Sequence, residues 1–282
     1  MRLPVNRSHL LTDKAMSFHR VLAILLRQYY LIRGSFTRVL PLFVWVVVDI
    51  VLWGFMTKYL NTVTSSGLDF VPMILGAVLL WDFFLRIMQG VTMAFFEDVW
   101  SRNFLNIFAT PLLISEYVTG LVLSSMATSC VGLVTMVVLA TGVFGLSFMV
   151  YGAMLVPFVL VLFLFGIALG ILGCSIVLRF GPAAEWFIWP IPALIAPFAG
   201  VFYPLTTLPA WMQYVAHFLP PAYVFEGMRT LVAGGNVPAG AMVSSLCLAV
   251  FDVVLACVVF TRTYRHAVRT GLIARYSAEN LG

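Results

Sequence analysis

Six long apolar runs leave this chain few ways to fold. A helix needs about 20 apolar residues to cross a hydrocarbon core about 30 Å thick. The runs lie at about 39–57, 71–95, 117–143, 150–177, 187–203 and 241–261, and the fifth is short and ends in a Pro-rich segment. Only 10% of the residues are charged, whereas soluble domains carry about 25%. The sequence therefore predicts an all-α integral membrane protein with six transmembrane helices.

The basic residues predict the orientation of these helices. If the N-terminus is cytoplasmic, thirteen of the sixteen Lys and Arg residues fall in the cytoplasmic segments, which are 1–38, 96–116, 178–186 and 262–282. The positive-inside rule then predicts that both termini are cytoplasmic. The net charge of +5 thus concerns orientation, and we expect no nucleic-acid partner.

Residues 1–38 are expected to form a cytoplasmic leader with an amphipathic helix at 15–33. Arg20 and Arg27 are seven residues apart, so they share one helical face. The apolar residues fall largely on another face, and they are Phe18, Leu22, Leu25, Tyr29 and Ile32. This pattern favours a helix in the membrane interface, with a plain cytoplasmic lead-in as the alternative.

Four charged residues lie within the predicted spans, where charge is costly and usually faces a bundle interior or a wet cavity. Asp82 and Arg86 are four residues apart and can pair on one helical face. A direct role for this pair in a translocation path is the alternative. Asp49 and Asp252 leave the structural and the functional reading equally open.

The stretch EDVWSRNFLNIFATP, residues 97–111, joins the second and third predicted spans. Its spacing predicts a short helix with an apolar stripe that comprises Trp100, Phe104, Ile107 and Phe108. Glu97 and Asp98 would lie in the first turn of that helix, Asp98 could pair with Arg102, and Pro111 would end the helix. Such a helix can lie on lipid or bind in the groove of a partner.

Residues 202–235, between the fifth and sixth predicted spans, are interrupted by Pro204, Pro209, Pro220 and Pro221. The pieces 210–219 and 222–233 are long enough for a few helical turns but too short to span. The pattern predicts a helical hairpin on the outer side, where Glu226 and Arg229 can pair. No Gly-rich phosphate loop, HExxH, GxSxG or Cys/His cluster occurs in the sequence. We therefore expect no ATP hydrolysis by this chain alone, and no cofactor or metal of its own.

Two segments resemble the permeases of ABC-2 type transporters. The first is 97–111, where the family shows an acid, a charged helix, a hydrophobic pair and Ala-Thr-Pro. The matching residues are Glu97, Ile107, Phe108, Ala109, Thr110 and Pro111, while Arg102 and Asn103 stand where members often carry Gly-Thr. The second is the outer segment, whose matching residues are Pro204, Leu208, Pro209, Trp211, Pro220, Glu226 and Arg229.

The resemblance implies a permease subunit of an ATP-driven exporter in a bacterial plasma (inner) membrane. Its membrane domain would cover 39–282, pair with a second permease copy and bind separate ABC ATPase subunits, which would hold ATP and Mg. A coupling helix at about 97–110 would dock on the ATPase through Glu97, Asp98, Trp100, Arg102, Asn103, Phe104, Ile107 and Phe108. The hairpin at about 204–235 would form an outer gate with Pro204, Pro209, Trp211, Pro220, Glu226 and Arg229.

Cargo identity does not follow from the resemblance. Many Phe and Met residues in the spans favour a hydrophobic, lipid-like or lipid-linked cargo. Two alternatives stay open at this point. One is a channel or secondary transporter that needs no ATPase, and the other is a lipid-modifying membrane enzyme built on Asp49, Asp82 and Arg86.

Overall fold

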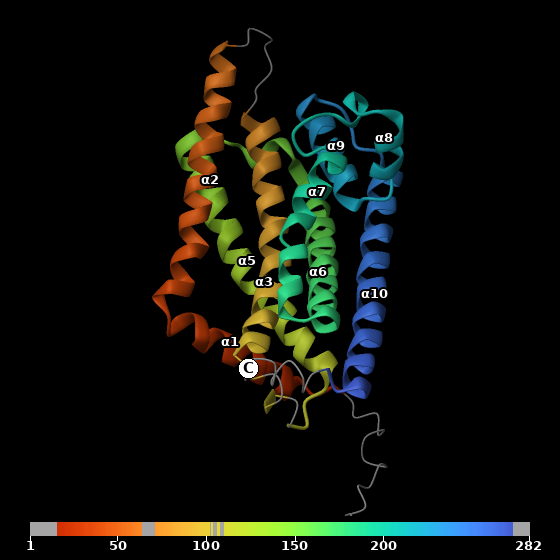
Figure 1. Ribbon diagram of the computed structural model, residues 1–282. Coiled ribbons are helices and arrows are strands. Elements are labelled where there is room, and N and C mark those ends of the chain that lie inside the picture. The colour runs from red at the N-terminus through yellow and green to blue at the C-terminus, as the bar shows by residue number, and fades with distance from the viewer. Residues whose placement is uncertain (1–15, 64–70, 102, 104–105, 108–109, 273–282) are drawn as a thin grey trace, which may run out of the picture.

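The computed structural model shows an elongated bundle of helices (Figure 1). It describes residues 16–63, 71–101, 103, 106–107 and 110–272. Within these ranges every regular element is helical, and five helical segments are long and apolar enough to cross a membrane. They are α2 (Phe36–Val63), η2 (Val71–Leu75) with α3 (Gly76–Trp100), α5 (Ile114–Phe144), η4 (Gly152–Met154) with α6 (Leu155–Phe180), and α10 (Ala239–Thr270). The chain is thus a multi-pass membrane protein.

The six-span layout is not confirmed, because the expected span at 187–203 does not form one long helix. It consists of the end of a 3-10 helix, η5 (Pro182–Phe187), and the ten-residue α7 (Pro190–Ala199). Ten residues of α-helix measure about 15 Å, half of the hydrocarbon core. The physical reason is proline, which begins α7 at Pro190 and recurs inside it at Pro197. A hydropathy count registers the apolar residues of this segment but not the backbone hydrogen bonds that its prolines cannot donate.

Helix α3 lies at the centre of the bundle between α5 and α6, and it is the most buried of the five long segments. Glycines allow the close approach on both sides. A Cβ at Gly166 or Gly170 of α6 would lie about 3 Å from Ile87 or Val91 of α3, and a Cβ at Gly90 of α3 would lie 2.3 Å from the Ser125 hydroxyl of α5. Gly166 and Gly170 of the fourth apolar run therefore serve packing within one chain.

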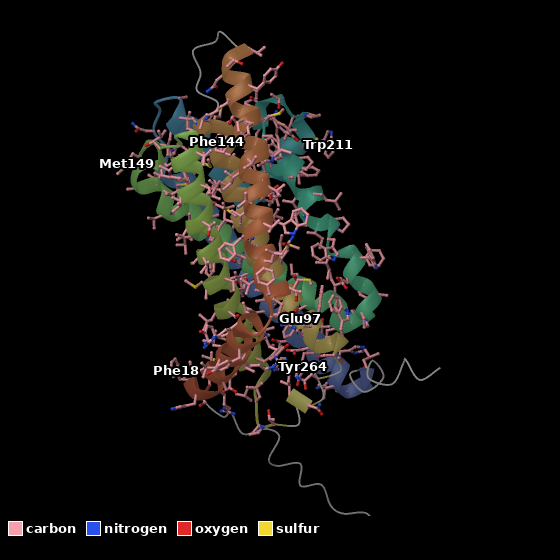
Figure 2. All side chains as sticks on the ribbon, turned by 90° about the vertical axis from the view of Figure 1, so that its left-hand side faces the viewer. Phe18, Glu97, Phe144, Met149, Trp211 and Tyr264 are labelled. Carbon is pink, nitrogen blue, oxygen red and sulfur yellow. The ribbon has the colours of Figure 1, made fainter. Side chains whose placement is uncertain are left out.

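The two ends of the bundle differ in their short helices. Helix α1 (Phe18–Arg33) lies across one end, beside the start of α5 and the end of α3. At the other end the chain forms η6 (Leu205–Thr207), α8 (Ala210–Ala216) and α9 (Pro220–Val232), within the range where the sequence predicts a hairpin. We call these the α1 end and the α8 end. Figure 2 shows Phe18, Glu97 and Tyr264 near the first and Trp211 near the second.

Candidate functional site

The sequence predicts a separate short helix that begins at Glu97. In the structure, residues 97–100 instead form the last turn of α3, and Ser101 is its C-cap. Glu97 and Asp98 therefore lie at a helix C-terminus, where the dipole disfavours acids. Two arginines, Arg27 of α1 and Arg38 of α2, offset this cost and supply a physical reason for acids at this position. The local sequence pattern cannot reveal these partners, because Arg38 lies 59 residues from Glu97 and Arg27 lies 71 residues from Asp98 along the chain.

Asp98 is buried at the α1 end, where it is 1% exposed. Its carboxylate accepts two hydrogen bonds from the guanidinium of Arg27, one of them at 2.9 Å from Nη1 to Oδ2. The Tyr117 hydroxyl of α5 donates a third at 2.7 Å. The bond to Asp98 raises the pKa of Arg27 above its usual value, so the guanidinium is charged at any working pH. The expected pair of Asp98 with Arg102 lies outside the described residues, because Arg102 is not among them.

Two further pairs join the same elements. The Arg38 guanidinium of α2 contacts Glu97 at 2.9 Å, and Arg20 of α1 contacts Glu116 of α5 at 3.1 Å. Glu116 is fully buried, and it also accepts the backbone N–H groups of Ser17 and Leu113. We call the three pairs Arg20–Glu116, Arg27–Asp98 and Arg38–Glu97 the arginine clamp. It ties α1 and α2 to the ends of α3 and α5.

The face of α1 toward the protein is thus the arginine face. Val21, Ile24 and Gln28 are buried beside it, while Phe18 and Tyr29 are exposed. Gly120 of α5 permits the contact, since a Cβ there would lie 2.5 Å from the Ile24 side chain. An exposed apolar face opposite an ion-paired face suits a helix that lies at the membrane interface.

The predicted apolar stripe of 97–110 is only partly within the described residues. Trp100 is 46% exposed, whereas Ile107 is buried in the core that contains Phe95 and Tyr117. The two residues therefore do not share one exposed face. Asn103 is half-buried, and its carbonyl accepts a bond from the Ile107 N–H at 2.9 Å. Arg102, Phe104 and Phe108 lie outside the described residues.

Three of the four charged residues of the predicted spans gather around one cavity of about 620 Å³ between α1, α2, α3 and α5. Asp49, Asp82 and Arg86 line it. Arg86 contacts Asp82 at 2.9 Å, as their spacing predicts, and its charge also acts on Asp49. Asp252 is half-buried on α10 and is not among the residues of the cavity wall.

At the α8 end, Glu226 of α9 holds the preceding loop. Its carboxylate accepts the Leu205 N–H at 2.5 Å and contacts Arg229 at 3.1 Å. The prolines of the predicted gate mark helix starts: Pro204 precedes η6, Pro209 precedes α8 and Pro220 begins α9. Trp211 is 63% exposed and packs edge-to-face on Phe198 of α7. The structure brings these residues into one cap.

Sequence reasoning missed the partners of the clamp. Arg38, Glu116 and Tyr117 received no role, although a buried acid and tyrosine at the start of a span are unusual. The available signal for these ion pairs was that Arg20 and Arg27 share one helical face, because two arginines on one face can pair with two acids elsewhere in the chain.

Comparisons with known proteins bear on most of the chain. The family model described as ABC-2 type transporter matches residues 20–232, which is more than half of the sequence. The match begins within α1 and ends at the last residue of α9. A search of curated proteins found no match.

Proposed function

The chain belongs to the family of ABC-2 type transporters, and on this premise we propose that it is the transmembrane permease subunit of an ATP-driven exporter. Members of this family are the membrane components of ABC transporters. In the proposed assembly two copies form the pathway, and separate ABC ATPase subunits bind ATP and Mg. The cell membrane would be the bacterial inner membrane, with the α1 end and both termini in the cytoplasm.

The observation that carries this proposal is the arginine clamp. The segment between α3 and α5, which the resemblance assigns to ATPase docking, begins and ends at residues fixed by ion pairs. Asp98 anchors its start and Glu116 anchors its far side, and both carboxylates are buried. A docking segment mounted on such a base transmits force to two membrane helices.

Exposed Trp100 gives the proposal a testable contact. It lies at the end of α3, 46% exposed, and packs against Phe96. Exposed aromatic side chains of this kind commonly carry the binding energy of protein interfaces. We therefore place Trp100 in the ATPase contact, together with Phe104 and Phe108 as the sequence suggests.

The experiment is co-purification. The tagged chain would be co-expressed with a candidate P-loop ABC ATPase, extracted in mild detergent and assayed for ATPase activity. We expect the ATPase to co-purify and Trp100→Asp to reduce its recovery at least tenfold, because a charge would be buried in an apolar contact. Trp211→Asp is the matched control, since Trp211 is also exposed but lies at the α8 end.

The opposite outcome is equally clear. If the chain elutes alone as a folded, monodisperse protein when the ATPase is co-expressed, it is not the permease of that ATPase. If Trp100→Asp and Trp211→Asp reduce ATPase recovery equally, the docking surface is not at the α1 end.

A further inference from the structure

We propose that the cavity between α1, α2, α3 and α5 binds the cationic group of an amphiphilic monocation, which deepens and rests on the proposed function by naming a cargo class. The cavity volume of about 620 Å³ falls within the range of small-molecule sites. The argument has three parts: the charge of the wall, a buried hydroxyl without a partner, and aromatic side chains at the wall.

The charge of the wall is one carboxylate in excess. Five ionisable residues of the wall carry charge, namely Arg38, Asp49, Asp82, Arg86 and Glu97. Two arginines face three acids, and the contacts account for two of these acids: Arg38 with Glu97 and Arg86 with Asp82, each at 2.9 Å. The Asp49 carboxylate is the remaining negative charge. The positive charge of Arg86 acts on both Asp49 and Asp82.

A charge this deep in a membrane bundle requires compensation. The Arg86 side chain lies against Gly132 of α5 and contacts Asp82, so its ion pair is with Asp82. A ligand with one positive charge would balance the wall. An anionic ligand would meet the same excess with repulsion.

Ser129 of α5 is an independent sign of a ligand. It lines the cavity and is 2% exposed, yet its hydroxyl has no hydrogen-bond partner among the described residues. A buried hydroxyl without a partner costs about 1–3 kcal/mol. The neighbouring Ser125, by contrast, donates to the Ile87 carbonyl at 2.9 Å. The hydroxyl of Ser129 therefore lacks a partner at the cavity wall, and an ammonium group that reached it would donate a hydrogen bond to it.

Aromatic side chains complete the site. Trp45 and Trp189 belong to the same wall and are 62% and 43% exposed. Tryptophan is the strongest partner for a cation over a ring face. Their indoles also offer apolar area to the hydrophobic part of a ligand. Together the wall fits a molecule with one positive charge and an apolar body.

The test uses the purified chain in nanodiscs and two probes of the same shape, tetraphenylphosphonium and tetraphenylborate. We expect saturable binding of the cation only, after subtraction of empty nanodiscs. Asp49→Asn should weaken cation binding about tenfold, which corresponds to about 1.4 kcal/mol. Asp252→Asn is the matched control and should leave it unchanged, since Asp252 is a half-buried membrane aspartate outside the cavity wall.

A second pair of measurements addresses Ser129. Tetraphenylphosphonium has no hydrogen-bond donor, so Ser129→Ala should leave its affinity unchanged. A primary phenylalkylammonium has N–H donors, so Ser129→Ala should weaken its binding several-fold. This selectivity also excludes misfolding, because a misfolded variant would lose both ligands.

Three results would overturn the proposal: no saturable cation binding, equal binding of the borate, or equal effects of Asp49→Asn and Asp252→Asn. The cation could be a free amphiphile or the amine of a lipid headgroup. Nanodiscs made with phosphatidylethanolamine would compete with the probe in the second case, compared with phosphatidylglycerol alone. The assay contains no ATPase, so co-purification of an ATPase without cation binding refutes only this inference. Cation binding without an ATPase partner refutes only the proposed function.

Discussion

Substitution of Asp98 by Asn is the most direct test of the arginine clamp. The change keeps the shape of the side chain and removes its charge and one acceptor. Arg27 then loses its counterion, while Tyr117, which is fully buried, keeps at best a weaker hydrogen-bond acceptor. Breaking a buried ion pair from one side costs about 3–5 kcal/mol. Because the Arg27 side chain is 29% exposed, water recovers part of this, and we expect a loss of about 3 kcal/mol.

The adjacent residue supplies the control. Glu97 pairs with Arg38 at 2.9 Å, but both side chains are about a third exposed, Glu97 at 34% and Arg38 at 36%. Exposed pairs contribute about 0–1 kcal/mol. Glu97→Gln should therefore have a small effect, although it removes the same kind of ion pair from the same helical turn.

Thermal unfolding of the purified chain in detergent measures the difference. A change of 1 kcal/mol shifts the Tm of a chain of 150–250 residues by about 2–4 °C, so Asp98→Asn should lower the Tm by about 6–12 °C and Glu97→Gln by less than about 4 °C. In the Asp98→Asn background, Tyr117→Phe should cost less than in the wild type, because the two residues interact. Equal Tm values for Asp98→Asn and Glu97→Gln would refute the view that buried Asp98 holds α1 in place.

Two further substitutions test the contacts at each end. Gly120→Ala should displace α1 and increase its protease accessibility, because the new Cβ would lie 2.5 Å from Ile24, whereas Gly142→Ala on the same helix meets nothing within 4 Å and should have no effect. Glu226→Gln should loosen the loop that it holds through the Leu205 N–H, which faster deuterium exchange at the Leu205 amide would reveal; exchange that is unchanged there would show that the carboxylate charge is dispensable.

Five long helices could be predicted from the sequence, because a membrane span demands length and apolarity that few other structures require. The expected helix at 187–203 failed for a local reason. Pro190 and Pro197 lie within a segment whose hydropathy resembles that of a span, and the resulting α7 is only ten residues long. The failure therefore comes from counting apolar residues without weighing proline.

The charged pairs could be predicted only where the two partners are close in the sequence. Asp82 with Arg86 and Glu226 with Arg229 are separated by one helical turn, and helical geometry alone predicts both pairs. The expected local partner of Asp98, Arg102, lies outside the described residues, and the bundle brings Arg27 to Asp98 from 71 residues away. Sequence spacing contains no information about such a contact. Any buried acid in a chain of this kind needs its distant cation identified from the fold.

The clamp and the cavity are parts of a single structure. Arg38 belongs to both, since it pairs with Glu97 and also lines the cavity. Asp82 and Asp98 lie on the same helix, α3, sixteen residues or about 24 Å apart. Because α3 is continuous between them, a displacement of its clamped end must move the cavity wall. Under the proposed function, a push by the ATPase on the segment after α3 would therefore change the site of the cation without any additional transmitting element.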